Sequence, residues 1–493
     1  ITFRETPLRL VADLVSLLSL LVLIGVASGR GRVRKGAVWQ SGKVAGLQGD
    51  GVTLLIVLLL VGLVLFAMTV GVLPRFDTVL QDSRVPPSGV AGFYGNGLNL
   101  LTYEMAARQM AADDSLLVQS NWRAPQSVAG DFRETVRLVD AEGLLWSPKT
   151  AVSPRWYRQP TPTYAWTPDQ FAESQLLIEP IPGTPPGLYT IQLVLFDEDS
   201  LAPVPLADGQ TTFDLGTVQV TRPQEAAKLE PQYPLNHSWN GVTLMGASLD
   251  REAAAPGDPF LLTLYWQVAD APPDDAVVRL ALVDEMETAV FSQDLPPIRA
   301  DFPTNQWRAG DAWLGQHAFR LPVALASGDY QWELAWCVAD VCAGETAVLG
   351  SLLINAPERL FNIPSLDIET NKQLGEMAAL LGVNLTIQPT TLQTTLVWQS
   401  NAETMTSYRV FVHLLDENGQ IVAQSDGEPA GWTRPTTGWL PGEIILDDHS
   451  LPLENVPSGR YQLRVGLYDP ESGERVMLAD GETAVILPEF MLP

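Results

Sequence analysis

The sequence divides near residue 75 into an apolar head and a long body in which apolar and polar positions alternate. In the head, residues 10–27 and 52–73 are almost entirely apolar, and the second segment carries no charge over 22 residues. A helix rises about 1.5 Å per residue, so that segment is long enough to cross a hydrocarbon core of about 30 Å. We therefore predict a transmembrane helical hairpin over residues 1–75, with spans at 10–27 and 52–73.

Charge in the head predicts its orientation. The loop at residues 28–51 carries five Lys and Arg side chains and a single acidic residue, Asp50. Short loops with this bias stay in the cytoplasm, so we expect residues after about 74 to be extracytoplasmic. The chain starts at Ile1 without a signal-peptide pattern. We therefore expect it to be the C-terminal part of a longer multi-pass protein of the bacterial plasma membrane.

The body contains three copies of one pattern, which is the strongest signal in the sequence. In each copy an aspartate follows a tryptophan by 18 residues, and a Gly-x-Tyr motif begins 43 to 47 residues after that aspartate. A second tryptophan lies between the aspartate and the motif. The four anchors are Trp122, Asp140, Trp166 and Gly187 in the first copy, Trp266, Asp284, Trp307 and Gly328 in the second, and Trp398, Asp416, Trp439 and Gly459 in the third.

Alternation within each copy predicts antiparallel β-structure. The segment from Tyr461 to Tyr468 alternates strictly, and Asp416-Glu-Asn-Gly419 is a turn sequence. Gly and Pro make up 77 of the 493 residues, which favours turn-rich β-structure over long helices. We predict a mainly β fold, with the helical hairpin followed by three tandem Ig-like β-sandwiches. The expected sandwiches span residues 76–222, 223–357 and 358–493.

The recurring aromatic residues have both structural and functional interpretations. Trp122, Trp266 and Trp398 lie in apolar strand contexts, and we expect them to be core residues rather than sugar platforms. The second tryptophans, Trp166, Trp307 and Trp439, lie in loop-like stretches rich in Pro, Thr and Gly. They are candidates for stacking on a glycan, but we favour the interpretation that they pack under a crossover loop.

Few other residues suggest chemistry. Cys337 and Cys342 flank a predicted turn, and an extracytoplasmic location would permit a disulfide between them. Asp447, Asp448 and His449 resemble metal ligands, but adjacent strand residues point to opposite faces and cannot all bind one ion. We therefore interpret these three as ordinary strand positions, with His317 at the position matching His449. The recurring aspartates are expected to bond their own turn backbones, and calcium remains a minor alternative.

Composition narrows the function classes further. The formal net charge is −27, while residues 1–75 carry +5, so the body carries −32. An acidic body disfavours nucleic-acid binding. The two cysteines and four dispersed histidines favour neither a zinc site nor a histidine metal cluster. We find no nucleophile elbow, zincin, P-loop or dinucleotide motif, and we predict no catalytic, cofactor or metal residue in this chain.

The third copy resembles a known module. The stretches FVHLLDENGQIVAQSDGEPAGWTRPTTGWLPGEIILDDHSLPL and PSGRYQLRVGLYDPESGERV are similar to β-sandwich modules at the C-terminus of large bacterial membrane glycosyltransferases of the dolichyl-phosphate-mannose protein mannosyltransferase type. The resemblance implies an accessory region that positions an acceptor or glycan, with the bilayer and a polyprenyl-linked sugar as partners. The catalytic aspartate of such enzymes lies in an early external loop, which is not part of this sequence. The alternatives are a non-enzymatic membrane-anchored spacer or adhesion protein and, third, a sensor.

Overall fold

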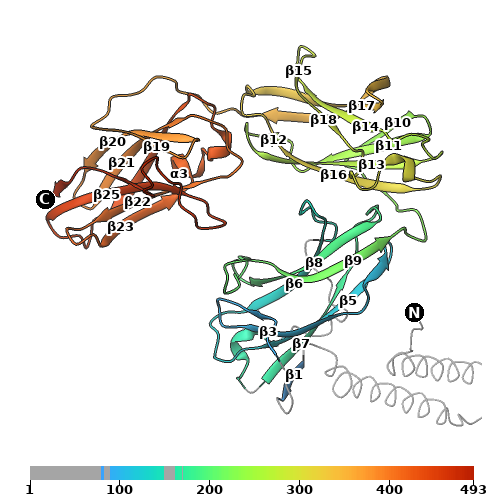
Figure 1. Ribbon diagram of the computed structural model, residues 1–493, viewed down its shortest axis with the longest axis horizontal. Helices are drawn as coiled ribbons and strands as arrows, with labels where there is room; N and C mark the ends of the chain where they lie inside the picture. The colour runs from blue at the N-terminus through green and yellow to red at the C-terminus, as the bar shows by residue number, and fades with distance from the viewer. Residues whose placement is uncertain (1–78, 83–88, 149–160, 169) are drawn as a thin grey trace, which may run out of the picture. The chain divides into compact units, whose positions relative to one another are not determined.

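The computed structural model describes residues 79–82, 89–148, 161–168 and 170–493. The predicted helical hairpin, with its two spans and its cytoplasmic loop, lies outside these residues. Within the described part of the chain, no helix is both long enough and apolar enough to cross a bilayer. Residues Leu73–Pro493 form one compact unit, and its described residues are mainly β-strand (Figure 1).

The strands form six sheets, two for each repeated unit, and we call each pair a sandwich. In the first sandwich a five-stranded sheet has the order β1-β7-β5-β3-β2, and a four-stranded sheet has the order β4-β9-β8-β6. A short 3₁₀ turn, η3 (Thr163–Ala165), precedes β7. The strands are β1 (Val79–Asp82), β2 (Gly92–Phe93), β3 (Asn99–Met105), β4 (Gln109–Ala111), β5 (Leu116–Arg123), β6 (Phe132–Val139), β7 (Gln170–Ile178), β8 (Gly187–Asp197) and β9 (Phe213–Thr221).

The second sandwich repeats this plan. Its four-stranded sheet has the order β10-β11-β13-β16, and its five-stranded sheet has the order β12-β18-β17-β14-β15. The turn η4 (Thr304–Gln306) occupies the place of η3. The strands are β10 (Tyr233–Trp239), β11 (Val242–Leu249), β12 (Ala253–Ala254), β13 (Pro259–Val268), β14 (Val277–Val283), β15 (Ala289–Leu295), β16 (Ala312–Arg320), β17 (Gly328–Val338) and β18 (Val341–Ile354).

The third sandwich has the sheet orders β19-β20-β21-β24 and β23-β22-β25-β26, with β27 also paired to β25. It has the turn η5 (Thr436–Gly438) and the short helical turn α3 (Pro429–Trp432), which has no counterpart among the described elements of the second sandwich. The strands are β19 (Ile368–Leu374), β20 (Ala378–Ile387), β21 (Thr391–Ser400), β22 (Arg409–Leu415), β23 (Ile421–Gly427), β24 (Ile444–Pro452), β25 (Gly459–Tyr468), β26 (Val485–Ile486) and β27 (Phe490–Leu492).

The pairing is antiparallel almost throughout, as alternation predicts. The exceptions among the described strands are two short edges, where β4 runs parallel to β9 and β12 runs parallel to β18. Strand β9 ends at Thr221 and β10 begins at Tyr233, while β18 ends at Ile354 and β19 begins at Ile368. The two Pro-containing stretches between these strands are therefore the connections between successive sandwiches.

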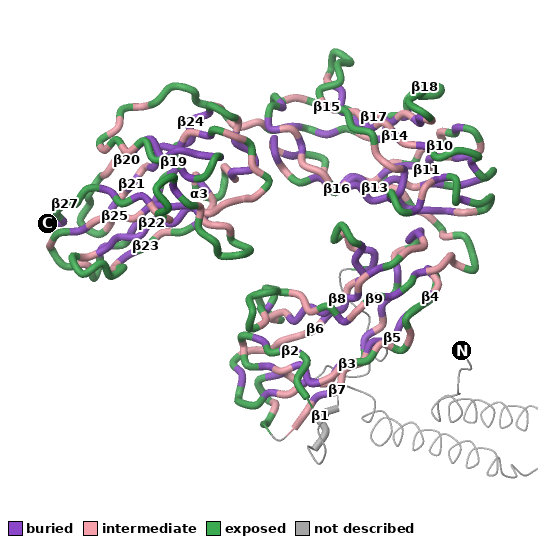
Figure 2. Tube along the Cα trace, in the orientation of Figure 1, coloured by how far each residue is buried: buried purple, intermediate pink, exposed green. Residues whose placement is uncertain are grey.

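Each sandwich has its own hydrophobic core between its two sheets. Strand β5 shows the pattern clearly, because every second residue from Leu116 to Trp122 is buried. Buried residues accordingly follow the strands, and exposed residues gather at the turns (Figure 2). Three large clusters of buried residues result, one centred in each sandwich, and a fourth, small cluster lies in the third sandwich. Burying alternate apolar side chains between two sheets is the main contribution that stabilises such a fold.

Candidate functional site

The first tryptophan of each repeat is a core residue, as the sequence predicts. All three side chains are at most 3% exposed. A buried indole N–H needs an acceptor, and each sandwich supplies a different one. The pairs are Trp122 Nε1 with Glu134 Oε2 (2.9 Å), Trp266 Nε1 with the Pro297 carbonyl (3.0 Å) and Trp398 Nε1 with Asp447 Oδ2 (3.2 Å).

The glycan-stacking hypothesis for the second tryptophans needs correction. Trp307 and Trp439 are 2% and 1% exposed, so neither ring presents a face to a ligand. Trp166 is half-buried and packs against the core of the first sandwich. In all three repeats the indole N–H donates to the carbonyl five residues earlier, which is Thr161, Phe302 or Arg434. These tryptophans therefore close the core under a loop.

A threonine at the start of each 3₁₀ turn explains why this loop packs against the sandwich. The sequence Pro-Thr-x-x-Trp recurs in all three repeats. In each, the threonine hydroxyl accepts a backbone N–H at or just before the start of β6, β14 or β22. The same hydroxyl donates to the carbonyl two residues before that N–H. For Thr436 the partners are Tyr408 N (2.9 Å) and Thr406 O (2.8 Å). Thr163 and Thr304 make the equivalent pairs of bonds. Side-chain hydrogen bonds thus fix the loop to the sheet that contains β6, β14 or β22.

The remaining recurring residues are also structural. Asp416 Oδ1 accepts the backbone N–H groups of Asn418 and Gln420, so this aspartate closes its own turn. Asp140 and Asp284 do the same in their repeats. The tyrosine of each Gly-x-Tyr motif donates its hydroxyl to the carbonyl four residues earlier, forming a tyrosine corner. The pairs are Tyr189 with Pro185, Tyr330 with Ala326 and Tyr461 with Pro457.

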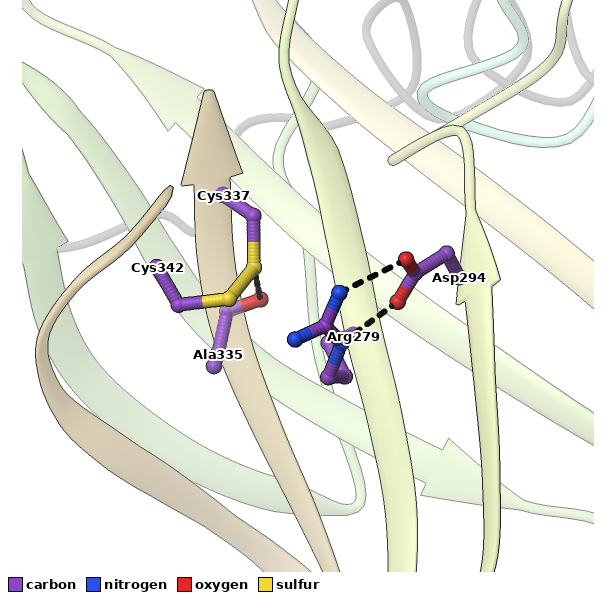
Figure 3. The surroundings of a disulfide bond; sticks show 5 residues. All are labelled: Arg279, Asp294, Ala335, Cys337 and Cys342. Carbon is purple, nitrogen blue, oxygen red and sulfur yellow. Dashed lines mark hydrogen bonds and ion pairs between the residues drawn. A yellow bond between two sulfur atoms is a disulfide. The ribbon is translucent and has the colours of Figure 1, made fainter. Parts of the chain in front are cut away.

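Cys337 and Cys342 are joined in a disulfide across the β17–β18 turn (Figure 3). The two residues are opposite each other in the strand register. Arg279 on the adjacent strand β14 forms a two-point ion pair with Asp294 on β15. Both partners are about two-fifths exposed, so this pair contributes little to stability. Nothing in this hairpin resembles a catalytic site.

The third sandwich contains a polar relay that the other two lack. Asp447 and His449 lie on the same face of β24, whereas Asp448 between them is exposed, which confirms the expected alternation. His449 Nε2 lies 3.0 Å from Asp447 Oδ2, and His449 Nδ1 lies 3.0 Å from Ser425 Oγ on β23. A hydrogen bond to the carboxylate requires Nε2 to donate, so Nδ1 accepts from the serine. The relay joins the edge strands of the two sheets.

Asp447 also fixes the turn α3. Its side chain is fully buried, and Oδ1 accepts the backbone N–H of Ala430 at 2.7 Å. Three successive residues of this turn have left-handed backbones: Ala430 (φ 52°), Gly431 (φ 61°) and Trp432 (φ 71°). Left-handed geometry costs an L-residue roughly 1–2 kcal/mol. A charged acceptor for Ala430 N–H helps to offset that strain.

In the second sandwich a backbone carbonyl, rather than a carboxylate, faces the buried tryptophan and histidine. Gly315 occupies the place of Asp447, and a side chain there would collide with the Pro297 carbonyl. That carbonyl accepts the indole N–H of Trp266 and lies 3.3 Å from His317 Nε2. Burial lowers the pKa of His317 to about 4, although the bond to the Pro297 carbonyl acts in the opposite direction. His317 is therefore a neutral core histidine.

The first connection between sandwiches is fixed by arginines. The Arg299 guanidinium lies 4.8 Å from the ring centre of Tyr189, and a side chain at Gly187 would collide with it. Arg222 forms an ion pair with Asp311. Two hydrogen bonds join the sandwiches directly: Gln316 Nε2 donates to the Leu145 carbonyl, and Leu314 N donates to the Gly183 carbonyl.

The second connection contains a buried carboxylate. Glu443 is 0% exposed and forms ion pairs with Arg359 from the connecting segment and Arg434. Arg359 also donates to the Val323 carbonyl of the second sandwich. One side chain therefore contacts both neighbours, and a buried charge with two cationic partners strongly disfavours their separation.

The described residues include an open, partly acidic cavity in the first sandwich. Within the described ranges, no group of three His, Cys, Asp or Glu side chains could hold a metal ion. An open cavity of about 600 Å³ beside β9 is lined by several carboxylates. One of them, Asp113, already accepts the backbone N–H groups of Gln224 and Glu225. The acidic lining is therefore partly used by the chain itself.

Comparisons with known proteins give a limited result. No family model matches the chain, and no curated protein matches it. Among solved structures, the FN1–FN3 domains of chicken CNTN1 match at 8% identity with a TM-score of 0.19, covering 81% of this chain and 99% of that one. A DUF4785 family protein from Legionella pneumophila matches at 11% identity with a TM-score of 0.17, covering 84% and 94%. These scores are too low to support an argument, so the fold rests on the strand pairing described above.

Proposed function

We propose that the three sandwiches act as a non-enzymatic, rigid extracytoplasmic spacer on a membrane-anchored protein of the bacterial surface. The single observation that carries this proposal is the contact of Arg359 with both the Val323 carbonyl and Glu443. Neighbouring domains in one chain ordinarily move against each other. A buried charge cluster at the connection opposes that motion, because bending would separate a largely buried ion pair.

Distance measurements on the full 493-residue chain test this function. Spin labels at Met286 and Met405, which are 82% and 72% exposed, report the separation of the second and third sandwiches. We expect a narrow distance distribution that broadens in Arg359→Ala. The matched control is Arg460→Ala, because Arg460 makes an exposed ion pair with Glu489 and lies away from the connection. A broad distribution in the unmodified chain would contradict the proposal.

A second candidate is the accessory region of a membrane glycosyltransferase, which holds an acceptor or glycan. The resemblance of the third repeat to the modules of such enzymes supports it, together with the apolar segments at 10–27 and 52–73. A photoreactive polyprenyl-phosphate sugar added to membranes that contain the full chain provides the test. Labelling of the chain above the level of a bystander membrane protein supports this role, and labelling at the bystander level removes it.

A further inference from the structure

The turn α3 displays an aromatic side chain that the repeat pattern does not require. Trp432 is 57% exposed, whereas the recurring tryptophans are buried or half-buried. In the second repeat, Ala300 stands at the equivalent position, seven residues before the second tryptophan. A bulky residue with a positive φ is uncommon and strained. Such strain on a displayed tryptophan points to a role outside the core.

The turn is fixed from several sides, so the position of Trp432 is well defined. The backbone N–H of Ala430 donates to the buried Asp447 carboxylate. Glu428, which precedes the turn, accepts the hydroxyl of Ser407 through its carboxylate and the backbone N–H of Trp432 through its carbonyl. The hydroxyl of Thr433 donates to the Ala430 carbonyl. A rigid platform loses little entropy when it binds a ligand.

The surroundings of the ring limit what can bind to it. The Arg409 guanidinium lies 5.0 Å from the ring centre, so a cation already occupies a favourable position on this tryptophan. Gly427 packs against the indole edge, because a Cβ there would lie 3.1 Å from Nε1. Among the described residues, no group accepts a hydrogen bond from that Nε1. The indole therefore offers exposed ring surface.

We propose that Trp432 is a binding platform for a neutral saccharide. Arg409 disfavours a second cation at the ring, and the charge of −32 on the body disfavours polyanions. A neutral sugar ring avoids both penalties. Its C–H face carries partial positive charge and matches the negative face of an aromatic ring. This inference goes beyond the spacer function, and either one can fail without the other.

Titration calorimetry of the full chain with maltohexaose, cellohexaose, mannohexaose and chitohexaose tests the proposal. We expect at least one of these to bind, and Trp432→Ala to weaken that binding by about tenfold or more. Trp432→Phe should recover part of the loss because the ring face remains. The matched control is Tyr164→Ala, since Tyr164 is 59% exposed in the first sandwich and should not affect binding.

The opposing outcomes are equally definite. If none of the four saccharides binds at about 10 mM, the site is not a saccharide platform. Binding that is unchanged in Trp432→Ala would place the ligand elsewhere and also overturn the proposal. A proline-rich peptide that loses affinity in Trp432→Ala, while no saccharide binds, would assign the surface to a protein partner instead. Because Trp432 is mostly exposed, its removal should leave the melting temperature nearly unchanged.

Discussion

The second and third sandwiches meet the same structural demand with different chemistry. In both, a buried tryptophan and a histidine converge on one acceptor. The second sandwich uses the backbone carbonyl of Pro297, which Gly315 makes room for. The third sandwich uses the carboxylate of Asp447, which has a second oxygen available. That oxygen binds Ala430 and fixes the turn that displays Trp432.

The comparison separates architecture from specialisation. Features present in all three sandwiches satisfy buried polar groups or close the core. The features found in one sandwich alone are the better candidates for function, because the fold does not require them. Four perturbations test this contrast.

The largest effect is expected from a side chain at Gly315. Gly315→Ala places a methyl group against the Pro297 carbonyl, which is backbone and cannot move aside. We expect a loss of more than about 3 kcal/mol in the free energy of unfolding, measured by denaturant titration. Gly459→Ala is the matched control, because a Cβ there meets only ordinary contacts. A variant as stable as the parent would mean that the carbonyl is not a fixed acceptor.

Acid should weaken the second sandwich through His317. Its pKa is about 4 in the folded chain and about 6.5 when unfolded, so the folded state favours the neutral ring. The contribution of the neutral ring to the free energy of unfolding is complete above pH 6.5. It is lost as the pH falls toward 4, and the total loss is about 3 kcal/mol. Thermal melts across this range should show a smaller decline in His317→Gln. Parallel declines in both proteins would contradict the buried neutral histidine.

Removing the charge of Asp447, the acceptor in the third sandwich, should have a moderate effect on stability. In Asp447→Asn, an amide group faces donors from Trp398, His449 and Ala430, so at least one bond is lost. A hydrogen bond to a charged group contributes about 2 kcal/mol, and we expect a loss of that size in denaturant titrations. The neighbouring residue Asp448 is exposed, so Asp448→Asn should change the free energy of unfolding by less than about 0.5 kcal/mol. Equal effects of the two substitutions would refute a specific role for Asp447.

The smallest effect is expected from the disulfide. Cys337 and Cys342 close a loop only a few residues long, and the chain-entropy relation gives at most about 2 kcal/mol for such a loop. The flanking strands are also paired along most of their length. Melting curves with and without reductant should differ by a few degrees, and the Cys337→Ser/Cys342→Ser variant should not respond to reductant. Loss of the folded transition on reduction would show that the hairpin holds more of the sandwich than its contacts indicate.

Much of the β-fold could be predicted because its determinants are local or periodic. Alternation placed Asp447 and His449 on one face and Asp448 on the other, and the spacing of repeated anchors identified Trp122, Trp266 and Trp398 as core residues. The loop tryptophans could not be assigned in the same way. Their neighbours are turn formers, and it is the burial of Trp307 and Trp439 and the hydrogen bonds of Thr304 and Thr436 that show these loops lying against the sheets of β14 and β22.

Trp432 was missed for a related reason. Recurrence attracted attention to the tryptophans shared by all copies, although recurrence in a tandem array mainly reports the needs of the fold. The available signal was the opposite one, a Pro-Ala-Gly-Trp sequence present in a single copy. Its display depends on a long-range bond from Ala430 to Asp447, seventeen positions away, which residue patterns alone do not reveal.

The cluster at Glu443 has a consequence for how such arrays diversify. Gene segments that encode single sandwiches are natural units of recombination, yet Glu443 depends on Arg359, which lies in the segment before the third sandwich. A crossover between them would transplant a buried carboxylate without one of its cations. The third sandwich is therefore expected to be inherited together with the connecting segment that carries Arg359, and viable crossovers should fall before Arg359.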